Sequence, residues 1–191
     1  MTQIAIAYHS GYGHTQRQAE AVHAGATGVA GVAARLYAVD KLDDAQWAEL
    51  DAADAIVFGA PTYMGSASAP FKTFMDESSK LWFTQAWKDK LAAGFTTSAS
   101  QSGDKLATLQ QMAVFAAQHA MVWIGLGLMP GNNNSKGSLG DLNRLGSFLG
   151  AMAQANADQG ADGMLDSDLK TAAHLGARVA ETAAALRRGR N

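Results

Sequence analysis

A loop near the amino terminus, rich in hydroxyls and glycine, has the composition of an anion-binding site. It follows the apolar run 4–8 and precedes a stretch over 15–27 with helical spacing of its apolar residues. The first loop consists of Ser10, Gly11, Tyr12, Gly13, His14 and Thr15. Between a strand and a helix, unpaired backbone N–H groups and the helix dipole attract a phosphate. A tight glycine turn capped by Thr15 is the alternative, and this loop alone does not separate the two.

Two further loops of small residues follow later strand-like runs. The second loop contains Pro61, Thr62, Tyr63, Met64 and Gly65, and the third loop contains Thr97, Ser98, Ala99, Ser100, Gln101, Ser102 and Gly103. Small residues let backbone amides approach a flat ligand closely. Neither loop carries a charged side chain, which favours a neutral ring edge over a metal ion. Each loop alone is also typical of an ordinary strand-end turn, but three at one edge predict a ligand site.

Alternating strand-like and helical stretches position these loops. The expected strands cover 4–8, 32–39, 55–58, 91–97 and 121–127, and the expected helices cover 15–27, 44–50, 70–80, 105–119 and 168–188. The third strand is expected to stop at Gly59-Ala60-Pro61. This order predicts an α/β fold with a doubly wound, five-stranded parallel sheet and helices on both faces. Ligands of such sheets bind beyond the carboxyl ends of the strands, where the three loops lie.

The segment 129–166 has two interpretations. It contains the polar run Gly131-Asn132-Asn133-Asn134, followed by Leu142, Leu145, Leu149 and Met152 at helical spacing. Long connections are often lids over a site. The segment is therefore either a lid with a short helix or a surface excursion.

Composition narrows the class of protein. The 191 residues suit one domain, and an apolar fraction of 48% excludes a disordered chain. With no cysteine, the chain has no disulfide, thiolate metal site or cysteine nucleophile, and we expect no metal. A net charge of −2 disfavours nucleic acid and anionic membranes as partners. The longest apolar run, 121–129, is too short to span a bilayer, and without a signal peptide we expect a cytoplasmic protein.

Several functions of such folds require residues that this chain lacks. The first loop has no lysine, as a nucleoside-triphosphate P-loop would need, and no G-x-G-x-x-G run for a nicotinamide dinucleotide. A phospho-receiver needs an acceptor aspartate where Gly59-Ala60-Pro61 stands, and a small tyrosine phosphatase needs a cysteine in the first loop. A G-x-S-x-G hydrolase elbow is also absent.

The run from Ile6 to Thr15 resembles the flavin mononucleotide (FMN) phosphate loop of the flavodoxin-like superfamily. More narrowly, the chain is similar to the WrbA-type NAD(P)H:quinone oxidoreductases over nearly its whole length, although it is shorter. The second loop, the stretch from Phe71 to Asp76 followed by Leu81-Trp82, the third loop and His119 match that family in order.

The resemblance implies a role for each matched residue. Ser10, His14 and Thr15, with the first-loop amides, would hold the FMN phosphate. The second and third loops would enclose the isoalloxazine ring. The open face, where substrate and nicotinamide stack in turn, would be lined by Tyr12, Trp82 and His119. No protein acid or base is obligatory.

The implied reaction is the two-electron reduction of quinones by NADH or NADPH through bound FMN, with ping-pong kinetics. The resemblance also implies a homodimer or homotetramer. Two alternatives stay open: a flavodoxin-type electron carrier and a non-catalytic flavodoxin-like interaction protein. Carriers are typically strongly acidic, unlike this chain, and the intact first loop argues against loss of the flavin.

Overall fold

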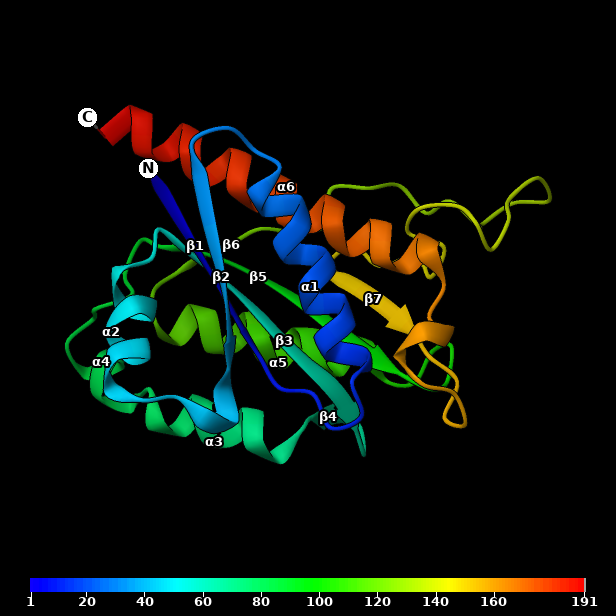
Figure 1. Ribbon diagram of the computed structural model, residues 1–191, viewed down its shortest axis with the longest axis horizontal. Helices are drawn as coiled ribbons and strands as arrows, with labels where there is room; N and C mark the ends of the chain where they lie inside the picture. The colour runs from blue at the N-terminus through cyan, green and yellow to red at the C-terminus, as the bar shows by residue number, and fades with distance from the viewer. Residues whose placement is uncertain (191) are drawn as a thin grey trace.

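The computed structural model describes residues 1–190 and shows a parallel sheet between two layers of helices (Figure 1). The strands are β1 (Thr2–Tyr8), β2 (Val32–Ala38), β3 (Ala55–Tyr63), β4 (Ser66–Ala67), β5 (Leu91–Ser98), β6 (Val122–Trp123) and β7 (Ala151–Gln154). The helices are α1 (His14–Thr27), α2 (Asp44–Ala52), α3 (Ala69–Glu77), α4 (Ser79–Phe83), α5 (Lys105–Gln118) and α6 (Asp166–Arg190), with 3-10 turns η1 (Val39–Lys41) and η2 (Ala161–Gly163). The predicted fold class is confirmed.

The main strands lie in the order β2-β1-β3-β5-β6, and all pair in parallel. The order reverses between β1 and β3, because the chain moves from β1 to one side and returns to place β3 on the other. A doubly wound sheet opens a crevice at this point. The loops that follow β1 and β3 are the first and second loops, so the topology places both at the predicted edge.

Each face of the sheet has its own apolar layer. On one face α1 and α6 pack side by side through Val22, Ala26, Leu175 and Val179 (Figure 1). Gly25 and Gly176 let the two helices touch, because a Cβ on either would overlap backbone of the other helix. The other face is covered by α2, α3 and α5, with large aromatic side chains in the core. These two layers bury the apolar residues of β1, β3 and β5 on both sides.

The third strand does not stop at Gly59, as the sequence predicted, but continues to Tyr63. A Cβ at position 59 would overlap the Phe95 ring of β5, so this position of the strand requires glycine. Pro61 pairs with Thr97 of β5, while β1 ends opposite Gly59 and β4 pairs only with Thr62 and Tyr63. Since proline is tolerated where no partner needs its N–H, the strand extends past it. This extension carries the second loop outward beyond the sheet.

The fifth strand is divided into two short pieces, which corrects the prediction of one strand over 121–127. After Val122–Trp123, residues 124–150 leave the sheet, and Ala151–Gln154 returns as β7 beside the second half of β5. Ile124 and Leu126 are buried in the α6 layer instead. Gly127 adopts φ +72 where a strand would need extended backbone. The excursion projects as the yellow-green loop of Figure 1 and contains no helix, so its leucine spacing does not reflect one.

The helix expected over 70–80 is also interrupted. α3 ends at Glu77 and α4 begins at Ser79, with the Ser78 hydroxyl donating to the Met75 carbonyl at 2.7 Å. Across residues 1–190, no helix is long and apolar enough to cross a bilayer.

Candidate functional site

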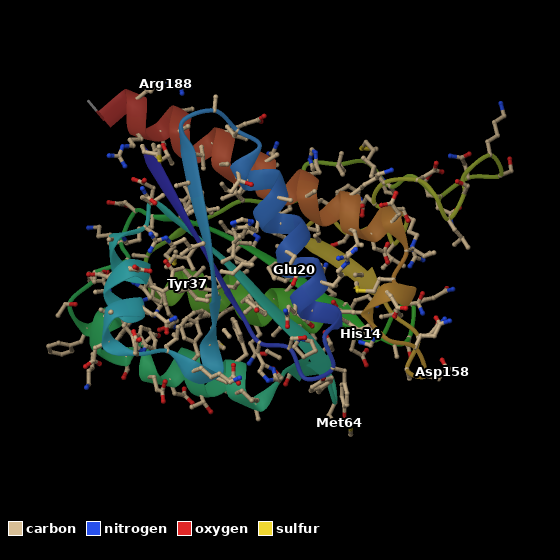
Figure 2. All side chains as sticks on the ribbon, in the orientation of Figure 1. His14, Glu20, Tyr37, Met64, Asp158 and Arg188 are labelled. Carbon is tan, nitrogen blue, oxygen red and sulfur yellow. The ribbon has the colours of Figure 1, made fainter. Side chains whose placement is uncertain are left out.

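One cavity of about 570 Å³ opens where β1, β3 and β5 end. It is lined by Ser10, Tyr12, His14, Thr15, Pro61, Thr62, Tyr63, Thr97, Ser98, Ala99, Ala155, Ala157 and Gln159. The structure thus brings together members of all three predicted loops. The remaining predicted members lie in those loops without lining the cavity: Gly11, Gly13, Met64, Gly65, Ser100, Gln101, Ser102 and Gly103. His14, Met64 and Asp158 mark this end of the molecule in Figure 2.

The first loop presents an uncapped helix start to the cavity. Gly13, at φ +90, precedes α1, and no side chain caps the helix, so Thr15 is not the cap that the sequence suggested. The Ser10 hydroxyl instead accepts the Gly13 N–H at 3.1 Å. The first-turn N–H groups of a helix without a side-chain cap need another partner. Thr15 is almost fully buried but is among the residues that line the cavity.

Tyr63 of the second loop lies across the first loop. A Cβ on Gly11 would stand 2.5 Å from the Tyr63 hydroxyl, so a larger residue at this position would push the Tyr63 side chain aside. The Tyr12 and Tyr63 rings meet edge to face with centroids 6.3 Å apart. Tyr12 remains 80% exposed at the mouth of the cavity. Met64 and Gly65, both with positive φ, form the turn into β4, and the Met64 side chain projects into solvent (Figure 2).

Buried hydroxyl groups fix the strand ends beneath the cavity. Thr62 bonds to Thr96 and Thr108, each at 2.8 Å, which joins β3, β5 and α5. Thr97 donates to the Gln18 side chain of α1 at 2.6 Å. Buried polar groups with satisfied partners hold their surroundings in one arrangement. The floor of the cavity is therefore prearranged by side chains from both helix layers.

Residues 155–159, after β7, form a fourth wall of the cavity that was not predicted from the sequence. Ala155 N–H donates to the Ser98 carbonyl at 3.1 Å, and the Gln159 carbonyl bonds to His14 Nε2 at 2.9 Å. This segment therefore joins the third loop to the first. The available signal was the alternation of Ala151 to Ala155 before the turn-forming run Asn156-Ala157-Asp158, but the helical spacing upstream obscured it.

Trp82 and His119 do not share this cavity within one chain. They line a separate groove of about 480 Å³ between α3, α4 and α5, together with Met75, Val114 and Phe115. Trp82 is 44% exposed there. His119 is only 2% exposed, and its Nε2 bonds to the Ser78 hydroxyl at 2.9 Å.

His119 has a packing role in the described chain. Its ring centroid lies 4.4 Å from that of Trp87, with the two planes tilted by 34°, and the ring packs edge to face with Phe115. Burial lowers the pKa of His119 to about 4, so the ring is neutral at pH 7. Within one chain His119 does not line the cavity of the three loops, whereas Tyr12 does, so their shared place on the open face stays a prediction.

The cavity is almost free of charge. Its lining contains no carboxylate, lysine or arginine, and His14 is its one titratable ring besides the tyrosines. Burial raises the pKa of Tyr63. Nowhere in residues 1–190 do three His, Cys, Asp or Glu side chains gather as a metal site requires. The site therefore offers amides and hydroxyls to a phosphate and small uncharged groups to a flat ring.

Comparison with known proteins identifies the class. The model of the NADPH-dependent FMN reductase family matches residues 14–132 of the chain. The chain therefore belongs to this family, and the flavin-dependent oxidoreductase class predicted from the sequence is confirmed at family level.

Individual relatives refine the comparison. The chain is 43% identical to flavodoxin FldP of Pseudomonas aeruginosa, over 94% of this chain and 96% of that protein. It is 33% identical to quinone-oxidoreductase QR2 of Triphysaria versicolor, over 94% of each. The crystal structure of a flavodoxin, WrbA-like protein from Agrobacterium tumefaciens superposes with a TM-score of 0.76 at 42% identity, over 97% of this chain and 99% of that one. The predicted resemblance to WrbA-type proteins is confirmed.

Proposed function

We propose that the protein binds FMN in the cavity of the three loops and uses it to carry electrons from NADH or NADPH to quinones. The observation that carries the proposal is the meeting of an uncapped helix start with two strand ends lined by small, uncharged residues. The helix start can bind a phosphate, and the small residues at the strand ends can pack against a flat ring. The family match and the quinone oxidoreductase among the relatives support it.

The residues present fit this group. Ser10, His14, Thr15 and the first-turn amides of α1 would hold the phosphate. The ring would lie between the second loop and residues 97–99 of the third. Bound FMN supplies a ring that accepts hydride from reduced nicotinamide and releases two electrons to an acceptor. The chain contributes position and exclusion of water, and Tyr12 supplies an aromatic surface at the mouth.

Because one cavity serves both substrates, we propose that nicotinamide and quinone bind in turn. We expect NADH or NADPH to bleach the bound flavin under anaerobic conditions, and benzoquinone to restore its absorbance. Double-reciprocal plots of initial rate against nicotinamide concentration, at several fixed quinone concentrations, should then be parallel. Intersecting lines would instead require both substrates to bind together and would contradict the shared cavity.

Electron carriage between proteins is a second candidate, favoured by the similarity to a protein named flavodoxin. The same anaerobic experiment separates the two candidates. A carrier would hold FMN that dithionite bleaches but reduced nicotinamide does not. Failure to bind FMN at all would contradict both candidates.

We further propose that Trp82 reaches the substrate side of the cavity from a second copy of the chain. The resemblance assigns Trp82 to the substrate face, whereas its own chain places it in the separate groove. Both statements hold together only in a homo-oligomer. The half-exposed Trp82 and the adjacent, strongly exposed Phe83 form an aromatic surface on α4 that suits such a contact.

Replacing Trp82 with alanine should lower turnover several-fold while FMN affinity stays unchanged, because the first loop is intact. Co-expression with Thr15→Ala chains tests the partner role. Mixed oligomers contain some sites with an intact first loop on one chain and an intact Trp82 on the other, so they should exceed the activity of either variant. A monomer by analytical ultracentrifugation, or no gain on mixing, would contradict the proposal.

A further inference from the structure

A buried lysine lies directly behind the third loop. Lys105 begins α5, and its side chain is fully buried. Its Nζ donates to the Ser98 hydroxyl at 2.7 Å and to the Ser100 carbonyl at 2.8 Å. A lysine is almost never fully buried unless its charge is compensated. Here the compensation comes from neutral oxygens of the third loop, one of them on Ser98, which lines the cavity.

The third loop is folded closely around this ammonium group. The Ser98 hydroxyl donates to the Ser100 carbonyl at 3.0 Å, so both acceptors of Lys105 also contact each other. Gly103, at φ +52, passes so close that a Cβ would overlap the Ser98 hydroxyl. The turn from Ser98 to Gly103 thus has the ammonium at its centre, and removing the donor leaves two oxygens without it.

The opposite side of the loop is held by a different element. Gln154 of β7 donates from Nε2 to the Ala99 carbonyl at 3.0 Å, and its backbone N–H donates to Asp168 of α6 at 2.9 Å. The loop backbone is therefore fixed from β7 on one side and from α5 on the other. Of these two anchors, only Lys105 carries a proton that it can lose.

The charges around Lys105 come from two packed segments. Burial lowers the pKa of Lys105 to about 8, Asp168 of α6 raises it, and Arg144 of the excursion lowers it. Asp168 and Arg144 are ion-paired with each other, so their effects on the lysine oppose. Lys105 is therefore charged at pH 7 and largely neutral at pH 9.

We propose that Lys105 is a positioning residue for the flavin ring: its ammonium group holds residues 98–103 in the shape that closes the cavity, so ring binding depends on the charge of Lys105. This inference rests on the proposed FMN site. If the third loop has its binding conformation in only a fraction of the molecules, the apparent affinity for the flavin ring is reduced by that fraction. A neutral amine still donates hydrogen bonds, but charge-assisted ones are roughly twice as strong.

The test measures riboflavin binding by fluorescence quenching from pH 6.5 to 9. Riboflavin is chosen because it lacks the phosphate, whose titration would otherwise contribute. The wild-type affinity should fall roughly 5-fold across this range, with its midpoint near pH 8. Lys105→Met should bind roughly 10- to 100-fold more weakly at pH 7 and show no dependence on pH.

Lys90 provides the matched control at the other end of β5. Its Nζ donates to the carbonyls of Asp51 and Ala53 at 2.6 and 2.7 Å, and burial lowers its pKa as well. Lys90→Met should retain the wild-type affinity and pH profile. Should Lys105→Met fail to fold, the profiles of the wild type and Lys90→Met decide. A flat wild-type profile, or equal binding by Lys105→Met, overturns the inference while FMN binding stands. Absence of flavin binding at every pH overturns the proposed function and this inference with it.

Discussion

Replacing Arg144 with leucine is expected to destabilise the protein by about 3–5 kcal/mol. Arg144 donates from Nε and Nη2 to the two oxygens of Asp168, at 2.8 and 2.7 Å, and both side chains are at least 97% buried. Taking away the guanidinium leaves a buried carboxylate without its counter-charge. Urea unfolding, followed by tryptophan fluorescence, measures the loss of unfolding free energy.

Two comparisons isolate the buried charge as the cause. The double variant Arg144→Leu with Asp168→Leu should recover at least about half of the loss, since no lone charge remains. Lys170→Met breaks an exposed ion pair with Asp166 on the same helix and should change stability by less than about 1 kcal/mol. If Arg144→Leu cost no more than Lys170→Met, the bidentate pair would not stabilise the fold as argued.

Thr15→Ala and Ser10→Ala are each expected to weaken FMN binding by roughly 10- to 150-fold. The loss of a hydrogen bond to a charged group costs about 1.5–3 kcal/mol, which corresponds to that range. Riboflavin should bind wild type more weakly than FMN does, and its affinity should hardly change in either variant. Fluorescence titration of both flavins, side by side, measures the difference.

Thr182→Ala serves as the matched control, because its hydroxyl donates to the Arg178 carbonyl on the exposed surface of α6. It should leave both affinities unchanged. Equal losses of FMN and riboflavin affinity in Thr15→Ala would mean that the loop acts on the ring or on folding. Unchanged FMN affinity in both first-loop variants would remove the phosphate from this loop.

The sequence predicted the elements that consist of strongly apolar runs or that end in clear turn residues. The buried runs of β1, β3 and β5 and the loops behind them lie where the patterns placed them. The apolar segment after Met121 predicted one strand over 121–127. Ile124 and Leu126 are instead buried against α6, outside the sheet. Strand β7, Ala-Met-Ala-Gln, consists of residues that favour helices, and only its pairing with β5 makes it extended.

The site was predicted where it depends on consecutive residues and missed where it depends on packing. Members of all three loops line one cavity, and each loop could be singled out because it combines small residues with a strand end. The fourth wall at 155–159 follows a strand that the pattern did not reveal. The clamp of Lys105 on Ser98 and Ser100 was invisible as well, since a lysine at a helix start is ordinarily solvated. Trp82 lies on α4, after the helix break at Ser78 that no sequence signal marked, and lines another groove.

The divided fifth strand has a consequence for the order in which the molecule assembles. Pairing β7 with β5 requires closing the excursion over 124–150, a loop of roughly 27 residues whose entropic cost is about 3 kcal/mol. The contacts of β1, β3 and β5 form a sheet without it, so we expect β7 to dock late in folding. With β7 come Gln154 and the fourth wall, so the cavity is complete only after β7 has docked. A ligand that binds this cavity then stabilises the final docking step by mass action and leaves the earlier core unaffected.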